Sequence, residues 1–218
     1  EGSLRRLGVD YVDLYQIHRF DDQTPVEETI RALEDLVKAG KVLYLGASSM
    51  MAWQFAKMLY VADQLGAPRF VCMQNHYNVV YREEEREMMP LCVEEGVAVT
   101  PYSPLARGFV AGNRTKEGSG DTQRAKVDEF SRRMYFENYD FAVVDQVTRV
   151  ARARGVSNAQ VALAWLMDQP GVAAPIVGAT NLNHLEDSVG AVGLKLEESE
   201  LEALSAQYKP HPILVGRR

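Results

Sequence analysis

Short apolar runs alternate along this chain with longer segments in which apolar residues recur every three or four positions. The runs cover residues 11–17, 42–47, 70–74, 97–102 and 172–177. Most are apolar at consecutive positions, which is typical of parallel strands that helices cover. The sequence therefore predicts an α/β fold with a parallel sheet and right-handed crossovers.

The segments between these runs carry helix start and stop signals. Helices are expected over about 3–7, 24–39, 55–65, 83–95, 141–154, 158–168, 181–191 and 197–207. Thr24, Pro25 and Glu27 combine an N-cap residue, a first-turn proline and a capping-box carboxylate. Ser157 and Gln160 form a second capping box. The run 172–177 is the weakest predicted strand, because its proline has no N–H for a ladder hydrogen bond.

Polar side chains follow these runs where successive parallel strands would end, as in Gln16-Ile17-His18, Ser48-Ser49, Gln74-Asn75 and Tyr102-Ser103. Barrels build active sites from such strand ends. A doubly wound open sheet usually carries a G-x-G-x-x-G turn, which this sequence lacks. The pattern favours a (β/α)8 TIM barrel, with residues 1–218 as one partial barrel domain. About five of the eight strand–helix units are expected here. Since the chain starts with Glu1, we expect the first three strands to be missing.

Composition narrows the classes of partner. The 218 residues are 46% hydrophobic, and the net charge of −6 argues against nonspecific nucleic-acid binding. No apolar run approaches the roughly 18 residues of a membrane span, and no signal-peptide pattern is present. Cys72 and Cys92 lie in apolar surroundings, so we expect buried free thiols and a cytoplasmic location. We expect no metal site.

Five blocks of sequence, in order, resemble the aldo-keto reductase family. They are Leu7-Gly8-Val9-Asp10-Tyr11-Val12-Asp13-Leu14-Tyr15-Gln16-Ile17-His18, Gly46-Ala47-Ser48-Ser49, Met73-Gln74-Asn75, Tyr102-Ser103-Pro104-Leu105-Ala106-Arg107-Gly108 and Pro175-Ile176-Val177-Gly178-Ala179-Thr180. Each block is a weak motif alone, but the ordered set covers nearly the whole chain. It resembles the carboxyl-terminal two-thirds of such an enzyme, in the aryl-alcohol-dehydrogenase-like branch.

The resemblance implies an oxidoreductase that moves a hydride between NADP(H) and a small aldehyde, ketone or aryl alcohol. His18 matches the family histidine that orients the carbonyl; a histidine that only caps a strand is the structural alternative. The family's acid tyrosine, lysine and aspartate have no match here. Tyr15 does not replace that tyrosine, since strand alternation points it away from the face of His18. The chain alone is therefore expected to be inactive.

The resemblance also assigns cofactor contacts. Gln74 matches the amide that binds the nicotinamide carboxamide, with Ser48 beside it, and Tyr102 matches the ring that stacks on the nicotinamide. The match to the pyrophosphate loop comprises Ser103, Pro104, Leu105, Ala106 and Arg107. Further basic residues follow it in the long polar stretch: Arg114, Lys116, Arg124 and Lys126. Their local excess of positive charge suits an anionic ligand, but for these four a solvated surface loop is the favoured interpretation.

The adenosine end of the cofactor is assigned to the start of a late helix, where free amides and the helix dipole suit a phosphate. The matching residues are Gly178, Thr180, Asn181, His184, Asp187 and Ser188. The family often has arginine or glutamine in place of His184. A partly charged histidine could hold a 2′-phosphate, so we expect NADP(H), with NAD(H) not excluded.

Two other functions stay open: a nucleotide-binding regulatory subunit of the channel-accessory type, which resembles this family, and an inactive truncated homologue. His76 and His211 have no partner motif and are interpreted as structural or exposed. The oligomeric state is left open, although unpaired sheet edges would favour self-association.

Overall fold

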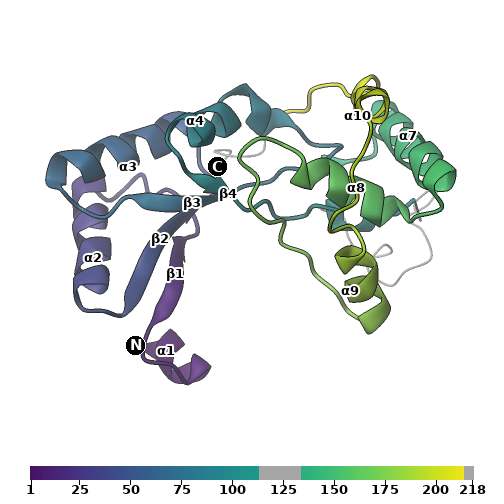
Figure 1. Ribbon diagram of the computed structural model, residues 1–218. Coiled ribbons are helices and arrows are strands. Elements are labelled where there is room, and N and C mark those ends of the chain that lie inside the picture. Colours follow the sequence, from purple (N-terminus) through teal and green to yellow (C-terminus); the bar gives the residue numbers. More distant parts are fainter. Residues whose placement is uncertain (113–133, 214–218) are drawn as a thin grey trace. The chain divides into compact units, whose positions relative to one another are not determined.

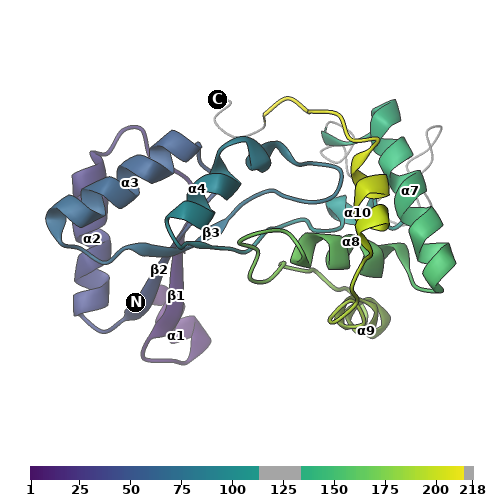
Figure 2. The same ribbon diagram turned by 45° about the horizontal axis from the view of Figure 1, so that its top comes forward.

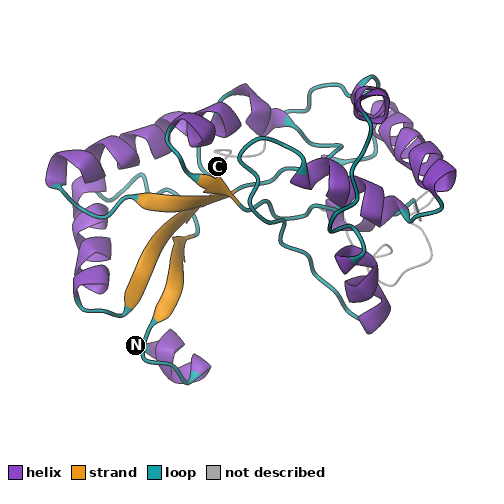
Figure 3. Cartoon of the chain, viewed as in Figure 1, coloured by secondary structure: helices purple, strands orange, loops and turns teal. Residues whose placement is uncertain are grey.

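A computed structural model describes residues 1–112 and 134–213 of the chain (Figure 1). The described residues divide into two compact units. Unit 1 consists mainly of Glu1–Asn75 and Glu85–Thr100, and unit 2 of His76–Glu84 and the described part of Pro101–Pro212. In the described part of the chain, the strands lie in unit 1, whereas unit 2 is built from helices and loops (Figure 3).

Unit 1 contains a parallel sheet, as the sequence predicts. The strands follow the order β1 (Val12–Ile17), β2 (Val42–Ser48), β3 (Phe70–Gln74) and β4 (Ala98–Val99). The helices of this unit are α1 (Gly2–Leu7), α2 (Val26–Lys38), α3 (Ala52–Leu65) and α4 (Met88–Glu94). Each of the three strand-to-strand connections contains one of the last three helices, which is the arrangement that parallel strands require. The predicted α/β class is confirmed.

One face of the sheet is buried. Leu45, Ala47 and Met73 are at most 1% exposed, and α2 and α4 contact β2 and β4. Phe70 meets Phe55 of α3 edge-on, with ring centroids 5.9 Å apart. Burial of side chains of this size stabilises by about 1.5–3 kcal/mol each. This face is the hydrophobic core of unit 1.

The other face carries a row of polar side chains. A register shift between Leu45 and Gly46 places an extra residue in β3. Cys72 and Gln74 thereby come onto the face of Gln16. Nε2 of Gln74 donates to Oε1 of Gln16 at 2.7 Å, and Nε2 of Gln16 donates to Sγ of Cys72 at 3.5 Å. The bulge thus aligns three neighbouring strands into one hydrogen-bonded row.

The hydrogen-bonded row of Gln16, Cys72 and Gln74 requires a glycine at position 46. Its register partner is Gln16, and a Cβ atom at position 46 would lie 2.6 Å from Cγ of Gln16. That atom is near the backbone and has little freedom to move. The side chain of Gln16 crosses β2 because residue 46 has no side chain.

Unit 2 is a helical assembly. Its elements after the 3₁₀ turn η2 (Ala106–Gly108) are α7 (Asn138–Arg154), α8 (Asn158–Met167), α9 (Leu182–Val189) and α10 (Glu198–Ser205). Helix α7 contacts α8 and α10, and α8 contacts α9 (Figure 2). Trp165 on α8 is 1% exposed and packs against the ring of Tyr77.

Two buried carboxylates attach the segment after α10 to the rest of unit 2. Oδ2 of Asp140 accepts the N–H groups of Phe136 and Glu137, and its Oδ1 lies 2.8 Å from Nε2 of His211. Oε1 of Glu83 accepts from the Tyr208 hydroxyl at 2.6 Å and from the N–H of His211 at 2.7 Å. His76 and His211 are both buried, so neither is the exposed histidine that was one of the two interpretations.

Several predicted helix starts are wrong. Helices α3 and α7 each begin about three residues earlier than expected, at Ala52 and Asn138. Helix α2 begins at Val26 with Pro25 as its N-cap, and the Thr24 hydroxyl donates to Oδ2 of Asp21 at 2.7 Å instead of capping the helix. The carboxylates near residue 84 form a separate 3₁₀ helix, η1 (Glu83–Arg86), before α4. The Ser157–Gln160 capping box is confirmed at the start of α8.

The expected fifth strand, residues 172–177, does not form, so four strands make up the described sheet rather than five. Ile176 makes an isolated parallel bridge to Tyr102, and its N–H donates to the carbonyl of Pro101 at 2.8 Å. Pro175 has no N–H to extend this pairing.

Gly46→Ala should destabilise the chain by about 1–3 kcal/mol, because the new methyl group overlaps Gln16. Urea denaturation measures the change. Gly178→Ala is the matched control, since a Cβ there meets nothing within 4 Å. In the Gln16→Ala background the cost of Gly46→Ala should largely disappear. Equal denaturation midpoints for Gly46→Ala and Gly178→Ala would contradict this account.

Asp140→Ala should cost about 3–5 kcal/mol, because it leaves two backbone N–H groups and the buried His211 ring without their acceptor. Asp145→Ala, at an exposed position of the same helix, should change stability by less than about 0.5 kcal/mol. Thermal and urea unfolding compare the two variants. A similar loss in both would show that the Asp140 contacts contribute little.

Candidate functional site

Three candidate residues lie in one row at the carboxyl edge of the sheet in unit 1. Ser48 and Gln74 are the last residues of β2 and β3 and are register partners. His18 follows Ile17, whose register partner is Ala47, so His18 is aligned with Ser48 on the next strand. Neighbouring strands lie about 4.8 Å apart. The sheet therefore brings an imidazole, a hydroxyl and an amide together, as the sequence predicts for a strand-end site.

The side chains in this row differ in their exposure and in the hydrogen bonds that already hold them. His18 is exposed, whereas Ser48 is buried, and its hydroxyl lies 3.2 Å from that of Ser49. Gln74 uses its Nε2 atom toward Gln16, so its Oε1 atom is the one suited to accept from a ligand amide. Ser49 has a φ of 47°, and its N–H donates to the Gln74 carbonyl. The last residues of two strands are thus tied to each other.

Tyr102 starts the candidate residues of unit 2. Its backbone forms parallel bridges with His76 on one side and Ile176 on the other. The next residue, Ser103, has a φ of 54°, and its carbonyl accepts from Nδ2 of Asn78 at 3.0 Å. Tyr102 is therefore fixed by backbone pairing, and the loop that follows it turns away at once.

The predicted phosphate loop has an unusual backbone. Ala106 and Arg107 have φ values of 47° and 56°, as does Ser103 at 54°, although none of the three is glycine. Such conformations cost about 1–3 kcal/mol each and concentrate at ligand-binding sites. Pro104 and Ala106 are buried, and Arg107 is half-buried. This strained loop carries a cation, which fits the binding of an anionic group.

The adenosine-side candidates surround the start of α9. Oδ1 of Asn181 accepts from the N–H of His184 at 3.0 Å, so one of the first-turn amides is already used. The Ser188 hydroxyl donates to the carbonyl of His184, within the helix. Oδ2 of Asp187 accepts from the Ser157 hydroxyl at 2.9 Å and so connects α9 with the start of α8. Gly178 and Thr180 lie in the exposed segment before the helix.

Sequence reasoning missed a buried cluster next to Tyr102. The ring of His76 stacks on those of Tyr81 and Tyr102, and the Tyr135 hydroxyl lies 2.5 Å from its Nε2 atom. Burial lowers the pKa of His76 to about 3, with smaller effects of His211 and Arg107. No local sequence pattern connects residue 76 with residue 135. The one readable signal was Asn78, whose Oδ1 atom accepts from two backbone N–H groups and so caps the turn at 78–81.

Sequence reasoning also missed an aromatic pair beyond the strand ends of unit 1, Phe20 and Trp53. The rings of Phe20 and Trp53 lie 6.1 Å apart, and Trp53 is 61% exposed. Both follow the carboxyl ends of strands, in the loop after β1 and in the first turn of α3. The basic residues predicted beyond Arg107 (Arg114, Lys116, Arg124 and Lys126) lie outside the described residues.

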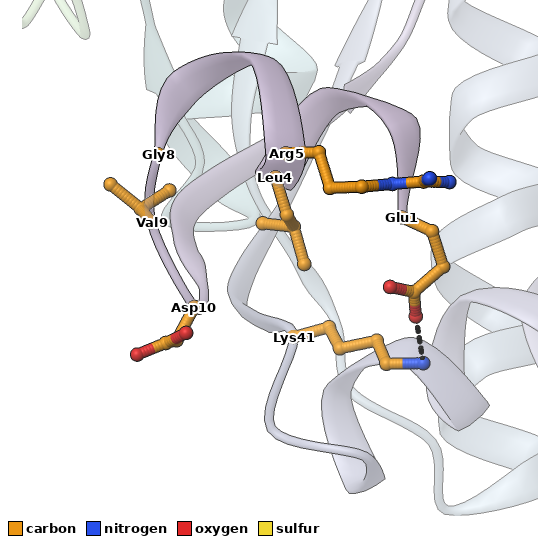
Figure 4. Close-up of a pocket in the computed structure, with 7 residues that line it drawn as sticks. All are labelled: Glu1, Leu4, Arg5, Gly8, Val9, Asp10 and Lys41. Atoms are coloured by element: carbon orange, nitrogen blue, oxygen red, sulfur yellow. Dashed lines mark ion pairs between the residues drawn. The ribbon is translucent and has the colours of Figure 1, made fainter.

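A hollow of about 380 Å³ lies at the opposite edge of the sheet in unit 1. It is lined by Leu4, Arg5, Gly8, Val9, Asp10, and the ion pair between Glu1 and Lys41, which precede β1 and β2 (Figure 4). In parallel α/β folds, residues at the amino ends of strands serve stability rather than chemistry. The candidate site is therefore the carboxyl edge and not this hollow.

Within residues 1–112 and 134–213, no group of three or more His, Cys, Asp or Glu side chains is placed to hold a metal ion. In the same ranges, no helix has the length and apolar character needed to cross a membrane.

Comparisons with known proteins bear on these residues as a set. The chain matches the family model of the aldo/keto reductase family over residues 1–209. An aldo-keto reductase of Fusarium vanettenii is 44% identical over 98% of this chain and 57% of its own length. A putative aryl-alcohol dehydrogenase of Schizosaccharomyces pombe is 41% identical over 98% of this chain and 59% of its own length. The versiconal hemiacetal acetate reductase of Aspergillus parasiticus is 41% identical over 100% of this chain and 63% of its own length.

Among solved structures, a thermostable aldo-keto reductase crystallised with the inhibitor epalrestat aligns with a TM-score of 0.73 at 28% identity. That alignment covers 94% of this chain and 63% of the other. The chain thus spans 57–63% of the length of these four proteins. The resemblance inferred from the five sequence blocks is confirmed: the chain belongs to the aldo/keto reductase family.

Proposed function

We propose that this chain serves an NADP(H)-dependent oxidoreductase that interconverts small carbonyl compounds and alcohols, including aryl alcohols. The observation that carries the proposal is the row of His18, Ser48 and Gln74 across the carboxyl edge of the sheet. We also propose that this sheet belongs to a (β/α)8 barrel. Family membership and four consecutive parallel strands support this architecture.

His18 is the residue that orients the substrate in this proposal. It is exposed at the strand end, and an imidazole N–H is a directional donor to a carbonyl oxygen. That bond strengthens as negative charge develops on the oxygen during reduction. When bound, NADPH supplies the hydride that the carbonyl carbon gains. The adjacent aromatic pair, Phe20 and Trp53, offers apolar surface to a substrate ring.

Gln74, Ser48 and Tyr102 fix the nicotinamide end of the cofactor. Oε1 of Gln74 accepts from the carboxamide, and the Ser48 hydroxyl adds a second uncharged contact. Both groups are constrained by neighbours, Gln16 and Ser49, so little rotamer freedom is lost on binding. The flat ring of Tyr102 packs against the nicotinamide ring. These contacts select which face of the ring meets the substrate.

Unit 2 supplies the phosphate contacts. Ser103, Pro104, Leu105, Ala106 and Arg107 bind the pyrophosphate, with Arg107 as the cation. Gly178, Thr180, Asn181, His184, Asp187 and Ser188 bind the adenosine side. His184, in the first turn of α9, is the residue assigned to the 2′-phosphate, so NADP(H) is favoured over NAD(H). The buried free thiols Cys72 and Cys92 support a cytoplasmic location.

We further propose that the family's acid tyrosine, lysine and aspartate have no counterpart within residues 1–218, so that these residues alone bind the cofactor without turnover. The same feature favours, as a second candidate, a nucleotide-binding regulatory subunit. Copurification of a partner protein with the native chain would distinguish the second candidate from the first.

Arg107→Ala should weaken NADP⁺ binding to the chain about tenfold, because one charge-assisted contact to phosphate is lost. Arg149→Ala, at an exposed position of α7, is the control and should leave the dissociation constant unchanged. Calorimetric titration measures both variants. If wild type binds NADP⁺ and Arg107→Ala binds it equally well, the assignment of the pyrophosphate loop is wrong.

His184→Ala should reduce the preference for NADP⁺ over NAD⁺ about three- to tenfold, because only NADP⁺ carries the 2′-phosphate. The neighbouring variant Asn183→Ala, also exposed, should keep the preference. Titration of each variant with both nucleotides gives the ratio of dissociation constants. An unchanged ratio in His184→Ala would remove the reason to favour NADP(H).

Purified residues 1–218 should bind NADPH but should not oxidise it in the presence of an aryl aldehyde. Absorbance at the nicotinamide band measures oxidation, and quenching of protein fluorescence measures binding. Steady oxidation of NADPH would show that a residue of this chain supplies the proton.

A further inference from the structure

The ring of His76 stacks on the ring of Tyr102. The two rings lie nearly parallel, with an interplanar angle of 12° and centroids 5.3 Å apart. The ring of His76 also stacks on that of Tyr81, with centroids 4.2 Å apart and an interplanar angle of 18°. His76 is 2% exposed. The buried imidazole is thus packed against both tyrosine rings.

The His76 ring is itself fixed in its plane. Its Nε2 atom lies 2.5 Å from the Tyr135 hydroxyl, which in turn accepts from Nδ2 of Asn78 at 3.3 Å. Nδ2 of Asn78 also lies 3.4 Å from Nε2 of His76. The edge of the imidazole is therefore held by Tyr135 and Asn78, and its face stacks on the neighbouring tyrosine rings.

Hydrogen bonds to the backbone also connect residues 76–78 with Tyr102 and with the loop that follows it. His76 and Tyr102 are bridge partners, and Nδ2 of Asn78 donates to the carbonyl of Ser103. Residues 76–78 thus contact both the ring of Tyr102 and the first peptide of the loop after it. Two contacts from one short segment define where Tyr102 lies and where the loop begins.

The neutral state of the His76 ring is compatible with a nicotinamide bound against Tyr102. Burial keeps the imidazole neutral at pH 7, with a pKa of about 3. A protonated ring here would repel the positive charge of an oxidised nicotinamide stacked on Tyr102. A neutral aromatic ring provides a flat surface without that repulsion.

We propose that His76 is a positioning residue, which holds the ring of Tyr102 in the plane that receives the nicotinamide of NADP(H). The inference rests on the proposed function, since it assigns a role to Tyr102 in cofactor binding. His76 acts through Tyr102 and does not contact the cofactor. The competing explanation is that His76 only fills the core of unit 2.

Two ligands separate these explanations. NADP⁺ carries the nicotinamide ring and 2′-phospho-ADP-ribose lacks it, so the dissociation constant of 2′-phospho-ADP-ribose divided by that of NADP⁺ reports the contacts of that ring. His76→Ala should lower this ratio about three- to tenfold, since one aromatic pair that supports Tyr102 is lost. His76→Phe keeps a flat ring and should restore most of the ratio. His211→Ala, at a second buried histidine of unit 2, should lower stability and leave the ratio unchanged.

The effect should also require Tyr102. In a Tyr102→Ala background, His76→Ala should produce no further change in the ratio. If His76→Ala does not fold, Tyr81→Leu carries the test: it removes the ring behind His76 and should lower the ratio in the same direction.

Equal weakening of both ligands by His76→Ala, or an unchanged ratio, would show that His76 only packs the core and would overturn the inference while the proposed function stands. A wild-type chain that binds neither ligand would overturn the proposed function and this inference together.

Discussion

Tyr102 pairs through its backbone with His76 on one flank and with Ile176 on the other. A residue paired on both flanks cannot change the direction of its Cα–Cβ bond without breaking one of these pairings. The loop after it has positive φ values at Ser103, Ala106 and Arg107, which cost about 1–3 kcal/mol each. That conformation persists because surrounding contacts, such as the bond from Asn78 to Ser103, hold it. The candidate cofactor residues of unit 2 therefore depend on this pairing.

In unit 1 the corresponding constraint is the register of the sheet. The bulge in β3 shifts Cys72 and Gln74 onto the face of Gln16, and the absence of a side chain at Gly46 gives Gln16 its path. Without that shift, strand alternation would turn Gln74 to the buried face, away from Ser48. A single extra residue thus decides whether the strand ends carry a usable row of polar groups.

The sequence was informative wherever the cause of structure is local. The apolar runs of β1, β2 and β3 and the capping box at Ser157 were predicted because period and cap chemistry act within a few residues. Thr24 failed as a cap because the helix starts one residue later, with Pro25 as its N-cap, and the Thr24 hydroxyl bonds Asp21 instead. Residues 172–177 failed as a strand because Pro175 has no N–H, and only isolated bridges form.

For the site, the family blocks predicted His18, Ser48 and Gln74, and the sheet aligns these three. The supporting cluster was not predictable in the same way. His76 acquires its environment from Tyr135, 59 residues away in sequence, and from two stacked tyrosines. Long-range packing of this kind leaves no periodic trace. The residues most able to fix Tyr102 are consequently those that motif reasoning interpreted as ordinary core.

The account depends most on the ring of Tyr102 facing the nicotinamide. Proton–proton Overhauser contacts, measured on the chain with labelled tyrosine rings and bound NADP⁺, test this directly, with Tyr102→Leu identifying the signals. The account predicts contacts between the nicotinamide ring protons and the Tyr102 ring. Contacts of the Tyr102 ring with the adenine protons alone, or with neither end of the cofactor, would contradict it.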